Sequence, residues 1–308
     1  MDRCSREHVL CNETRPKLPL PKRILKISTA NNTIHLYQPG VAEFARYATL
    51  SYCWGEGVPS RTTTENIRSH LSEIPMSSFP ATLRDAIDLA KALGFVYIWI
   101  DALCIIQDDE NDWAEQAAQM TDIYRGCALN IAASDSPGCD VGIITTIDGF
   151  SVSVGTTKCG DCVSNIRVAT DRHRLHPSKH ILSTRGWTLQ ETGVSVSTLF
   201  VFHHEISWEC CTGSCDCNGW QQSSENHEIE SRKWAWATAC MSESRLLSSR
   251  HHNNHIDDMP WKGAYPQHWK SWNNWVQDYS KRSLTKATDK LPALAGVAAQ
   301  FATLNKTT

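Results

Sequence analysis

The sequence predicts an α/β protein with a mostly parallel sheet flanked by helices, because strand and helix patterns alternate over residues 47–133. Residues 97–100 (Tyr-Ile-Trp-Ile) form a continuous apolar run, which is typical of a strand covered on both faces. The preceding stretch, 80–94, repeats apolar residues at three- and four-residue steps and ends on a glycine. These two segments indicate a helix that packs on a buried strand.

The remaining elements follow from the same patterns, in chain order. Besides 97–100, we expect strands at 23–28 and 33–38 (a hairpin around Asn31-Asn32), at 47–55, 128–133 and 150–154, and a pair of strands within 198–210. Besides 80–94, we expect helices at 111–125, 183–191, 232–239, 269–279 and 290–304. The strand–helix alternation weakens after residue 134, so the C-terminal half is predicted to be an elaborated α+β region.

The chain has 308 residues, enough for one large domain or two. We divide it into an N-terminal extension (1–20), an α/β core (21–210), a polar Cys/His-rich insertion (211–260) and C-terminal helices that pack on the core (261–308). The formal net charge of −3 argues against nucleic acid as a partner. The sequence lacks an apolar run of about 18 to 20 residues and a signal peptide, so we expect no membrane span and a cytoplasmic location.

Candidate site residues follow two of the predicted strands. In open α/β sheets, ligands bind outside the carboxyl ends of the strands. The first segment supplies Ser51, Trp54 and Glu56, and the second supplies Asp101 and Gln107. A carboxylate directly after a buried strand must be hydrogen-bonded or paired, so Asp101 is the candidate that chemistry favours. The neighbouring acids 108–110 are explained equally well as caps of the next helix.

The thirteen cysteines are expected to be mostly reduced in a chain without a secretory signal. Most are then core residues or metal ligands. Cys159 and Cys162 have the two-residue spacing of a zinc knuckle. A second pair, Cys210 and Cys215 from a group that also contains Cys211, Cys217, His203 and His204, could complete four ligands. The spacing of the second pair is irregular, so the sequence favours the absence of zinc over a site built from these four.

Three blocks of sequence resemble the fungal heterokaryon incompatibility (HET) domain. They are 47–55 (YATLSYCWG), 97–109 (YIWIDALCIIQDD) and 183–191 (STRGWTLQE). The resemblance extends to Trp208-Glu-Cys210 and to the segment from Trp275 to Leu291, and so covers nearly the whole chain, from about Leu18 to Phe301. It implies a fungal cytosolic protein of the class that triggers cell death when genetically different hyphae fuse.

The resemblance also implies a candidate chemistry. HET domains are similar to Toll/interleukin-1 receptor (TIR) domains, some of which hydrolyse NAD with a glutamate on the helix after a central strand. Glu115 lies on the corresponding predicted helix, but the TIR pattern places the glutamate four residues after a tryptophan, where this sequence has Ala117 after Trp113. Cleavage of NAD would need a carboxylate, Asp101 or Glu115, and a group that holds the pyrophosphate.

The third block supplies the remaining candidate ligand-binding residues: Arg185 as the phosphate clamp, Trp187 as a stacking surface, and Glu191. Each has a structural alternative. Arg185 and Glu191 could form an ion pair that orients the turn at Gly186, and Trp54, Trp99 and Trp187 could belong to the core.

Two function classes remain open. The first is a signalling or effector module of the HET class that acts through a protein partner or by self-association. The second is an enzyme, which divides into an NAD glycohydrolase and a HET-fold enzyme of secondary metabolism that uses Asp101 or Glu115 as general acid or base on a small molecule. A deep pocket at the strand ends would favour an enzyme, and a shallow apolar patch would favour an interaction module.

Overall fold

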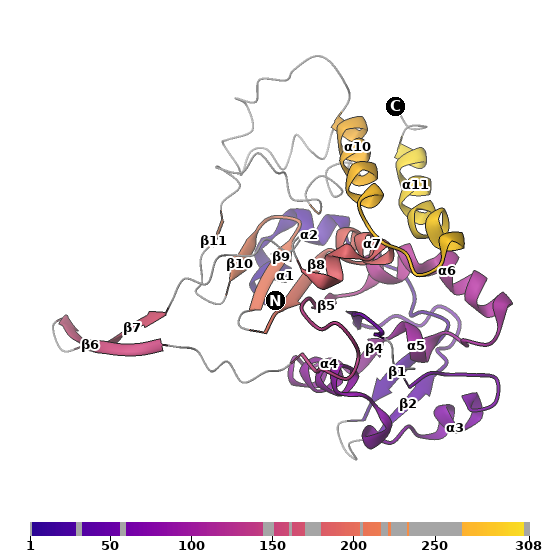
Figure 1. Ribbon diagram of the computed structural model, residues 1–308, viewed down its shortest axis with the longest axis horizontal. Coiled ribbons are helices and arrows are strands. Elements are labelled where there is room, and N and C mark those ends of the chain that lie inside the picture. Colours follow the sequence, from indigo (N-terminus) through magenta and orange to yellow (C-terminus); the bar gives the residue numbers. More distant parts are fainter. Residues whose placement is uncertain are drawn as a thin grey trace.

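The computed structural model describes residues 2–28, 33–55, 60–143, 151–159, 162–169, 180–203, 206–216, 221–222, 233 and 267–304. Within this part of the chain, one large mixed sheet forms the centre of the molecule (Figure 1). Its strand order is β11-β10-β9-β8-β5-β3-β4-β1-β2.

The middle of the sheet is parallel. It comprises β8 (Ser197–Val201), β5 (Leu129–Ala133), β3 (Ala48–Ser51) and β4 (Tyr97–Trp99). All residues of β3 and β5 are buried, as expected for strands that helices cover on both faces. The predicted strands at 47–55, 97–100 and 128–133 are confirmed, although the first and second are shorter than expected.

Both edges of the sheet are antiparallel, so the expectation of a mostly parallel sheet is wrong there. At one edge, β1 (Ile24–Ile27) pairs with β4 and forms the predicted hairpin with β2 (Ile34–Tyr37). At the other edge, β9 (Ile206–Cys210) pairs with β8, and β10 (Ser214–Asp216) and β11 (Gln221–Gln222) follow. Loop length explains the pairs β1–β2, β8–β9, β9–β10 and β10–β11, because a parallel neighbour needs a crossover of a dozen or more residues and these connections are shorter. It does not explain the pair of β1 and β4, which are far apart in the sequence.

Two helices connect the parallel strands and enclose the core. The chain passes through α4 (Ala81–Ala92) from β3 to β4, and through α6 (Glu110–Gly126) from β4 back past β3 to β5. These crossovers run in opposite directions, so their right-handed geometry places the helices on opposite faces. The inward residues of α4 are fully buried: Leu83, Ala86, Ile87 and Ala90. Gly94, at a φ of +80°, terminates this helix as predicted.

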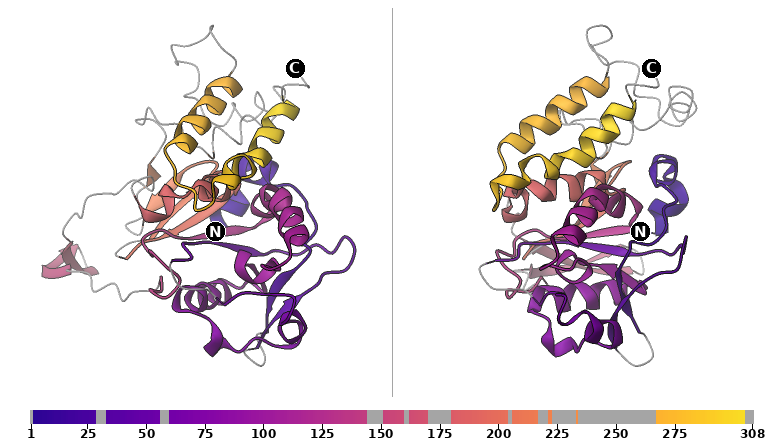
Figure 2. Two further views of the ribbon diagram at one scale, coloured as in Figure 1. Left: turned by 45° about the vertical axis from the view of Figure 1, so that its right-hand side comes forward. Right: turned by 90° about the vertical axis from the view of Figure 1, so that its right-hand side faces the viewer.

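Three more of the described helices lie on the face of the sheet that α6 covers. The helix α7 (Gly186–Val194) contacts α6, β3 and β5, and α10 (Gln267–Ser280) and α11 (Pro292–Leu304) pack over it (Figure 2). Trp275 of α10 is fully buried in this layer. The helices expected at 183–191, 269–279 and 290–304 are therefore confirmed, with α7 beginning three residues later than predicted.

The remaining described elements are short or separate. A two-stranded sheet of β6 (Ser151–Cys159) and β7 (Cys162–Ala169) contains the strand expected at 150–154 and a partner that the sequence did not reveal. The short helices are α1 (Asp2–Glu7), α2 (Val9–Thr14), α3 (Ile67–Ser72), α5 (Asp101–Cys104) and the 3-10 turns Met76–Ser78, Ile181–Thr184 and Ala287–Lys290. Most of the predicted insertion 211–260, with its helix at 232–239, lies outside the described residues, so that boundary stays a prediction. None of the described helices combines the length and the apolar character that a membrane crossing requires.

Candidate functional site

The three sequence blocks meet at the carboxyl edge of the parallel strands. β3 lies between β4 and β5, and the chain leaves β3 toward one neighbour and returns to the other, so β3 marks the switch point of the sheet. The segment after β3 (52–55), the start of α5 after β4, and the start of α7 all lie at this edge, as the hydrogen bonds described next establish. The predicted convergence of the Ser51, Asp101 and Arg185 segments is therefore observed.

Asp101 is the first residue of α5 and is held by three neighbours. The indole Nε1 of Trp54 donates to Oδ2 at 3.0 Å, and the backbone N–H of Ala102 donates to Oδ1 at 2.7 Å. The amide of Gln107 donates to the backbone carbonyl of Asp101 at 3.1 Å, so Gln107 positions the loop rather than the carboxylate. Burial raises the pKa of Asp101, while these hydrogen bonds and the charge of Arg185 oppose the rise.

Arg185 joins the first and third blocks. Its Nη1 donates to the backbone carbonyl of Tyr52 at 2.7 Å, at the end of β3. The C-terminal segment fixes Arg185 from behind, because Arg282 Nη1 donates to the Arg185 carbonyl at 3.2 Å and the Gly186 N–H donates to the Ser283 carbonyl at 2.8 Å. A Cβ at Gly186 would lie 2.4 Å from a methyl carbon of Leu284, so this approach requires a glycine.

Glu191 lies at the same edge, one turn and a half along α7, and its side chain is 7% exposed. Burial raises its pKa to about 7, and the charge of Asp101 adds to the rise, while Ser51, Arg185 and Tyr124 oppose it. A carboxyl group with this pKa exchanges a proton near neutral pH. Two carboxyl groups therefore share one site with an arginine, in environments that are not equivalent.

Three hydroxyl groups and one amide complete the buried part of the cluster. Ser51 Oγ donates to Asn130 Oδ1 at 3.2 Å, and Tyr124 donates to the Leu50 carbonyl at 3.1 Å. The Tyr52 hydroxyl is buried beside the carboxylate of Asp101. Burial and the neighbouring Asp101 raise the pKa of Tyr52 well above its usual value.

The turn after Trp54 depends on glycine. Gly55 adopts a φ of +78°, and a Cβ there would lie 2.8 Å from the Cα of Gly138. The sequence of the first block therefore fixes both the indole that binds Asp101 and the turn that presents it. Glu56, also predicted for this site, lies outside the described residues.

Two predicted residues lie elsewhere. Glu115 is on the outer side of α6, 48% exposed and ion-paired with Lys22, and it makes no contact with the Asp101 cluster that the structure records. Trp187 donates from Nε1 to Asp289 at 3.1 Å and stacks edge-on against Trp113. Glu115 thus lies at a solvated position of its helix, and Trp187 packs against the core, which is the structural alternative that the sequence left open for it. Trp99 is likewise buried in the core.

A second polar group at this edge was not predicted. Asp135 follows β5 as Asp101 follows β4, and its carboxylate pairs with the imidazole of His180 and accepts from the backbone N–H of His203 at 3.2 Å. A small hollow opens here, lined by Asp135, Ser136, Gly142, Ile143, Val201, Phe202 and His203. The same rule that identified Asp101, a carboxylate directly after a buried strand, could have identified Asp135.

The four cysteines considered for zinc do not all fall on described side chains. Cys159 and Cys162 face each other across the β6–β7 turn, and their side chains lie outside the description. Cys215 lies opposite Trp208 in the ladder rather than opposite Cys210. Among described residues, Cys210 instead gathers with Cys4, His8 and Cys11.

The fold and the site together define a mixed α/β domain with a partly buried carboxylate–arginine cluster at its topological switch point. The family model described as heterokaryon incompatibility protein (HET) matches residues 47–191, from the start of the first sequence block to the end of the third. The chain is a heterokaryon incompatibility domain protein. No curated protein and no solved structure matches it.

Proposed function

We propose that this protein is an effector module of non-self recognition in fungi, and that the cluster around Asp101, Arg185 and Glu191 produces its cell-death output by hydrolysing NAD. The family match supports a role related to heterokaryon incompatibility. The cytoplasm, where NAD is abundant, is the compartment in which such an effector would act.

The residues of the cluster fit the chemistry of N-glycosidic hydrolysis. The bond between nicotinamide and C1′ of the ribose breaks, nicotinamide leaves with the bonding electrons, and water forms the new bond to C1′. Asp101 would stabilise the positive charge that develops at C1′. Glu191, with a pKa of about 7, would accept the proton that the attacking water loses.

The remaining groups would bind rather than react. The guanidinium of Arg185 suits the pyrophosphate, since it presents paired donors that match phosphate oxygens. The Tyr52 hydroxyl, which lies beside the Asp101 carboxylate, would bind a ribose hydroxyl. The single observation that carries this function is the meeting of a buried carboxyl group, Glu191, a partly buried one, Asp101, and the arginine Arg185 at the carboxyl edge of the sheet.

The test is release of nicotinamide from NAD by the purified full-length chain, measured by chromatography. Wild type should release nicotinamide, and Asp101→Asn and Glu191→Gln should each reduce the rate by about 100-fold or more. Glu115→Ala is the matched control, because this exposed carboxylate is ion-paired with Lys22 and should leave the rate unchanged.

Two outcomes would overturn the proposed chemistry. The first is no nicotinamide release at high protein concentration. The second is an activity that Glu115→Ala abolishes and Asp101→Asn does not, which would assign the reaction to the helix position that the TIR resemblance implies.

A further inference from the structure

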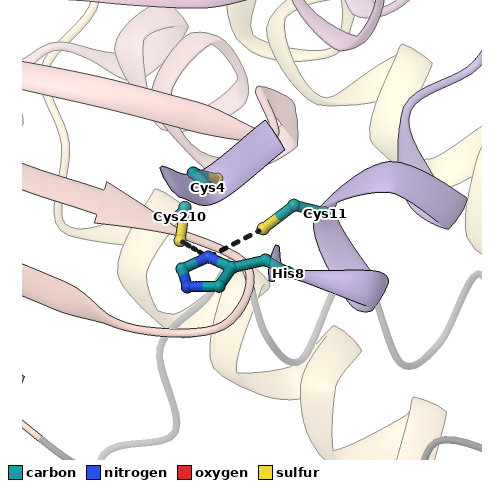
Figure 3. A group of neighbouring side chains, drawn as sticks. All are labelled: Cys4, His8, Cys11 and Cys210. Carbon is teal, nitrogen blue, oxygen red and sulfur yellow. Dashed lines mark hydrogen bonds between the residues drawn. The ribbon is translucent and has the colours of Figure 1, made fainter. Parts of the chain in front are cut away.

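Three cysteines and a histidine gather at the end of β9, three of them close together near the N-terminus and the fourth about 200 residues further along the chain. Cys4 belongs to α1, His8 lies between α1 and α2, Cys11 belongs to α2, and Cys210 is the last residue of β9 (Figure 3). The His8 N–H donates to the Cys4 carbonyl at 3.2 Å, so a helical turn joins them and brings Cys4, His8 and Cys11 to one side. That side faces β9.

From this arrangement we infer that Cys4, His8, Cys11 and Cys210 form a structural zinc site. The four candidate ligand atoms all lie within 4.8 Å of one another. His8 Nδ1 is 3.4 Å from Cys210 Sγ and 3.9 Å from Cys11 Sγ. Zn–S bonds of about 2.3 Å and Zn–N bonds of about 2.0 Å, at tetrahedral angles, require S···S separations of about 3.8 Å and S···N separations of about 3.5 Å. The site therefore has nearly the dimensions that zinc requires.

The chemistry of the donors selects zinc and a structural role. Three thiolates and one imidazole are a closed four-ligand set, which leaves no coordination position for water or substrate. Soft thiolates disfavour Mg²⁺ and Ca²⁺, which prefer oxygen ligands. Thr212 Oγ1 lies 3.5 Å from Cys11 Sγ, in the position of a hydroxyl that supports a ligand sulfur from outside the coordination shell.

The packing around the cluster contributes little stability, and a bound metal would add to it. Helices of six residues are too short to be stable in water without tertiary contacts. The buried side chains of this corner form a cluster separate from the main core, and it consists mainly of cysteines: Cys4, Cys11, Val196, Cys210 and Cys211. The apolar surface area buried at this corner is therefore small. Coordination by zinc would anchor residues 2–14 to β9.

Cys211 provides a matched control. It is buried beside the site, but its thiol donates to the Val196 carbonyl at 3.6 Å and accepts from Thr14 Oγ1 at 3.7 Å. It also interacts with Cys11, but it is absent from the group of four. A cysteine of the same burial and neighbourhood is thus predicted to be dispensable for the metal.

The test is the zinc content of the full-length chain, purified under reducing conditions without a polyhistidine tag or added metal, and measured by mass spectrometry. We expect about one zinc per chain in wild type and in Cys211→Ser, and a loss of at least five-fold in Cys4→Ser, Cys11→Ser and Cys210→Ser. Because a variant could lose zinc by unfolding, wild type is also exchanged with Co²⁺, which should give the visible bands of tetrahedral cobalt with thiolate ligands.

Four results would overturn this site. They are no zinc in the purified wild type together with no binding of added zinc, a disulfide between two of the three cysteines in the freshly isolated chain, iron in place of zinc, or equal zinc loss in Cys211→Ser. None of these results depends on NAD hydrolysis, so the zinc site is tested independently of the proposed function.

Discussion

The centre and the edge of the sheet each hold a buried polar cluster, but the two are supported in opposite ways. At the centre, Asp101 and Glu191 lie on elements that the main hydrophobic core fixes from both faces. At the edge, Cys4 and Cys11 lie on short helices that bury little besides the cysteines themselves. In the first region packing positions the polar residues, and in the second region the polar residues position the chain.

This contrast separates chemistry from architecture. Polar groups whose positions are fixed by the packing of other residues are available for a reaction, because the structure does not depend on them. Polar groups that hold an element in place are committed, because their release frees that element. This contrast is why we propose a functional role for the carboxylate–arginine cluster and a structural role for the Cys/His cluster.

The largest effect is expected for the buried ion pair that anchors the start of β1 to α6, beside the central strands. Arg23 and Asp112 are both nearly fully buried, and Arg23 also donates to the Cys104 carbonyl at 2.8 Å. Asp112→Ala leaves the guanidinium buried without its anion and should lower the free energy of unfolding by about 3–5 kcal/mol in urea denaturation. The exposed pair of Asp122 and Arg125 is the control, and Asp122→Ala should cost less than about 1 kcal/mol. Equal costs would mean that burial does not govern the strength of these pairs.

The next effect concerns the glycine that lets α7 approach the C-terminal segment. Gly186→Ala forces a methyl group against Leu284 and should lower the free energy of unfolding by about 1–3 kcal/mol. It should also displace Arg185 and reduce nicotinamide release. Gly213→Ala is the control, since no atom lies within 4 Å of the added carbon. A Gly186→Ala variant as stable and active as Gly213→Ala would show that the segment adjusts without loss.

Glu191 should make stability depend on pH within the central region. Its pKa is about 7 in the folded protein against 4.5 for an ordinary glutamate, so between these values the unfolded chain binds fewer protons than the folded one. Stability should then fall as pH rises from 4.5 toward 7, by at most about 1.4 kcal/mol per pH unit from this group. Glu191→Gln should flatten the curve in that window. An unchanged slope, measured by urea unfolding at several pH values, would contradict the shifted pKa.

The smallest global effect is expected when the edge cluster loses its metal. Removal of zinc by a chelator should abolish amide hydrogen-exchange protection in residues 2–14 and leave the protection of β3, β4 and β5 unchanged. The free energy of global unfolding should change by less than about 1 kcal/mol, because the main core does not include α1 or α2. Loss of protection throughout the sheet would show that the two regions are not independent.

The sequence predicted the elements with an apolar pattern, including the hairpin at one edge, better than the short elements around β9, for a physical reason. Apolar periodicity marks elements that bury one face, so the helix at 81–92 and the strand at 97–99 could be predicted from their own residues. The helices α1 and α2 bury cysteines and carry no such pattern, and β10 and β11 are too short to show one. Local periodicity does not predict an element that only long-range contacts stabilise.

The residues of the candidate site could be predicted where a rule of sheet topology applied. They could not be predicted where their position depends on the rotation of a helix about its axis. Asp101, Trp54 and Arg185 follow from the rule that ligands bind at carboxyl ends of strands together with the family resemblance. Glu115 could not be placed, because its side of α6 depends on how that helix rotates to bury Asp112 and Gln116. Asp109, by contrast, caps α6 as expected, accepting from the Asn111 and Asp112 N–H groups.

The most direct test of the central claim is the viability of hyphae that express the protein in a filamentous fungal host. Wild type and Glu115→Ala should both kill the cells when expressed at equal abundance, and Asp101→Asn should leave them viable. Killing by Asp101→Asn at the wild-type rate would contradict the claim that the cluster at the carboxyl edge of the sheet is where this protein acts.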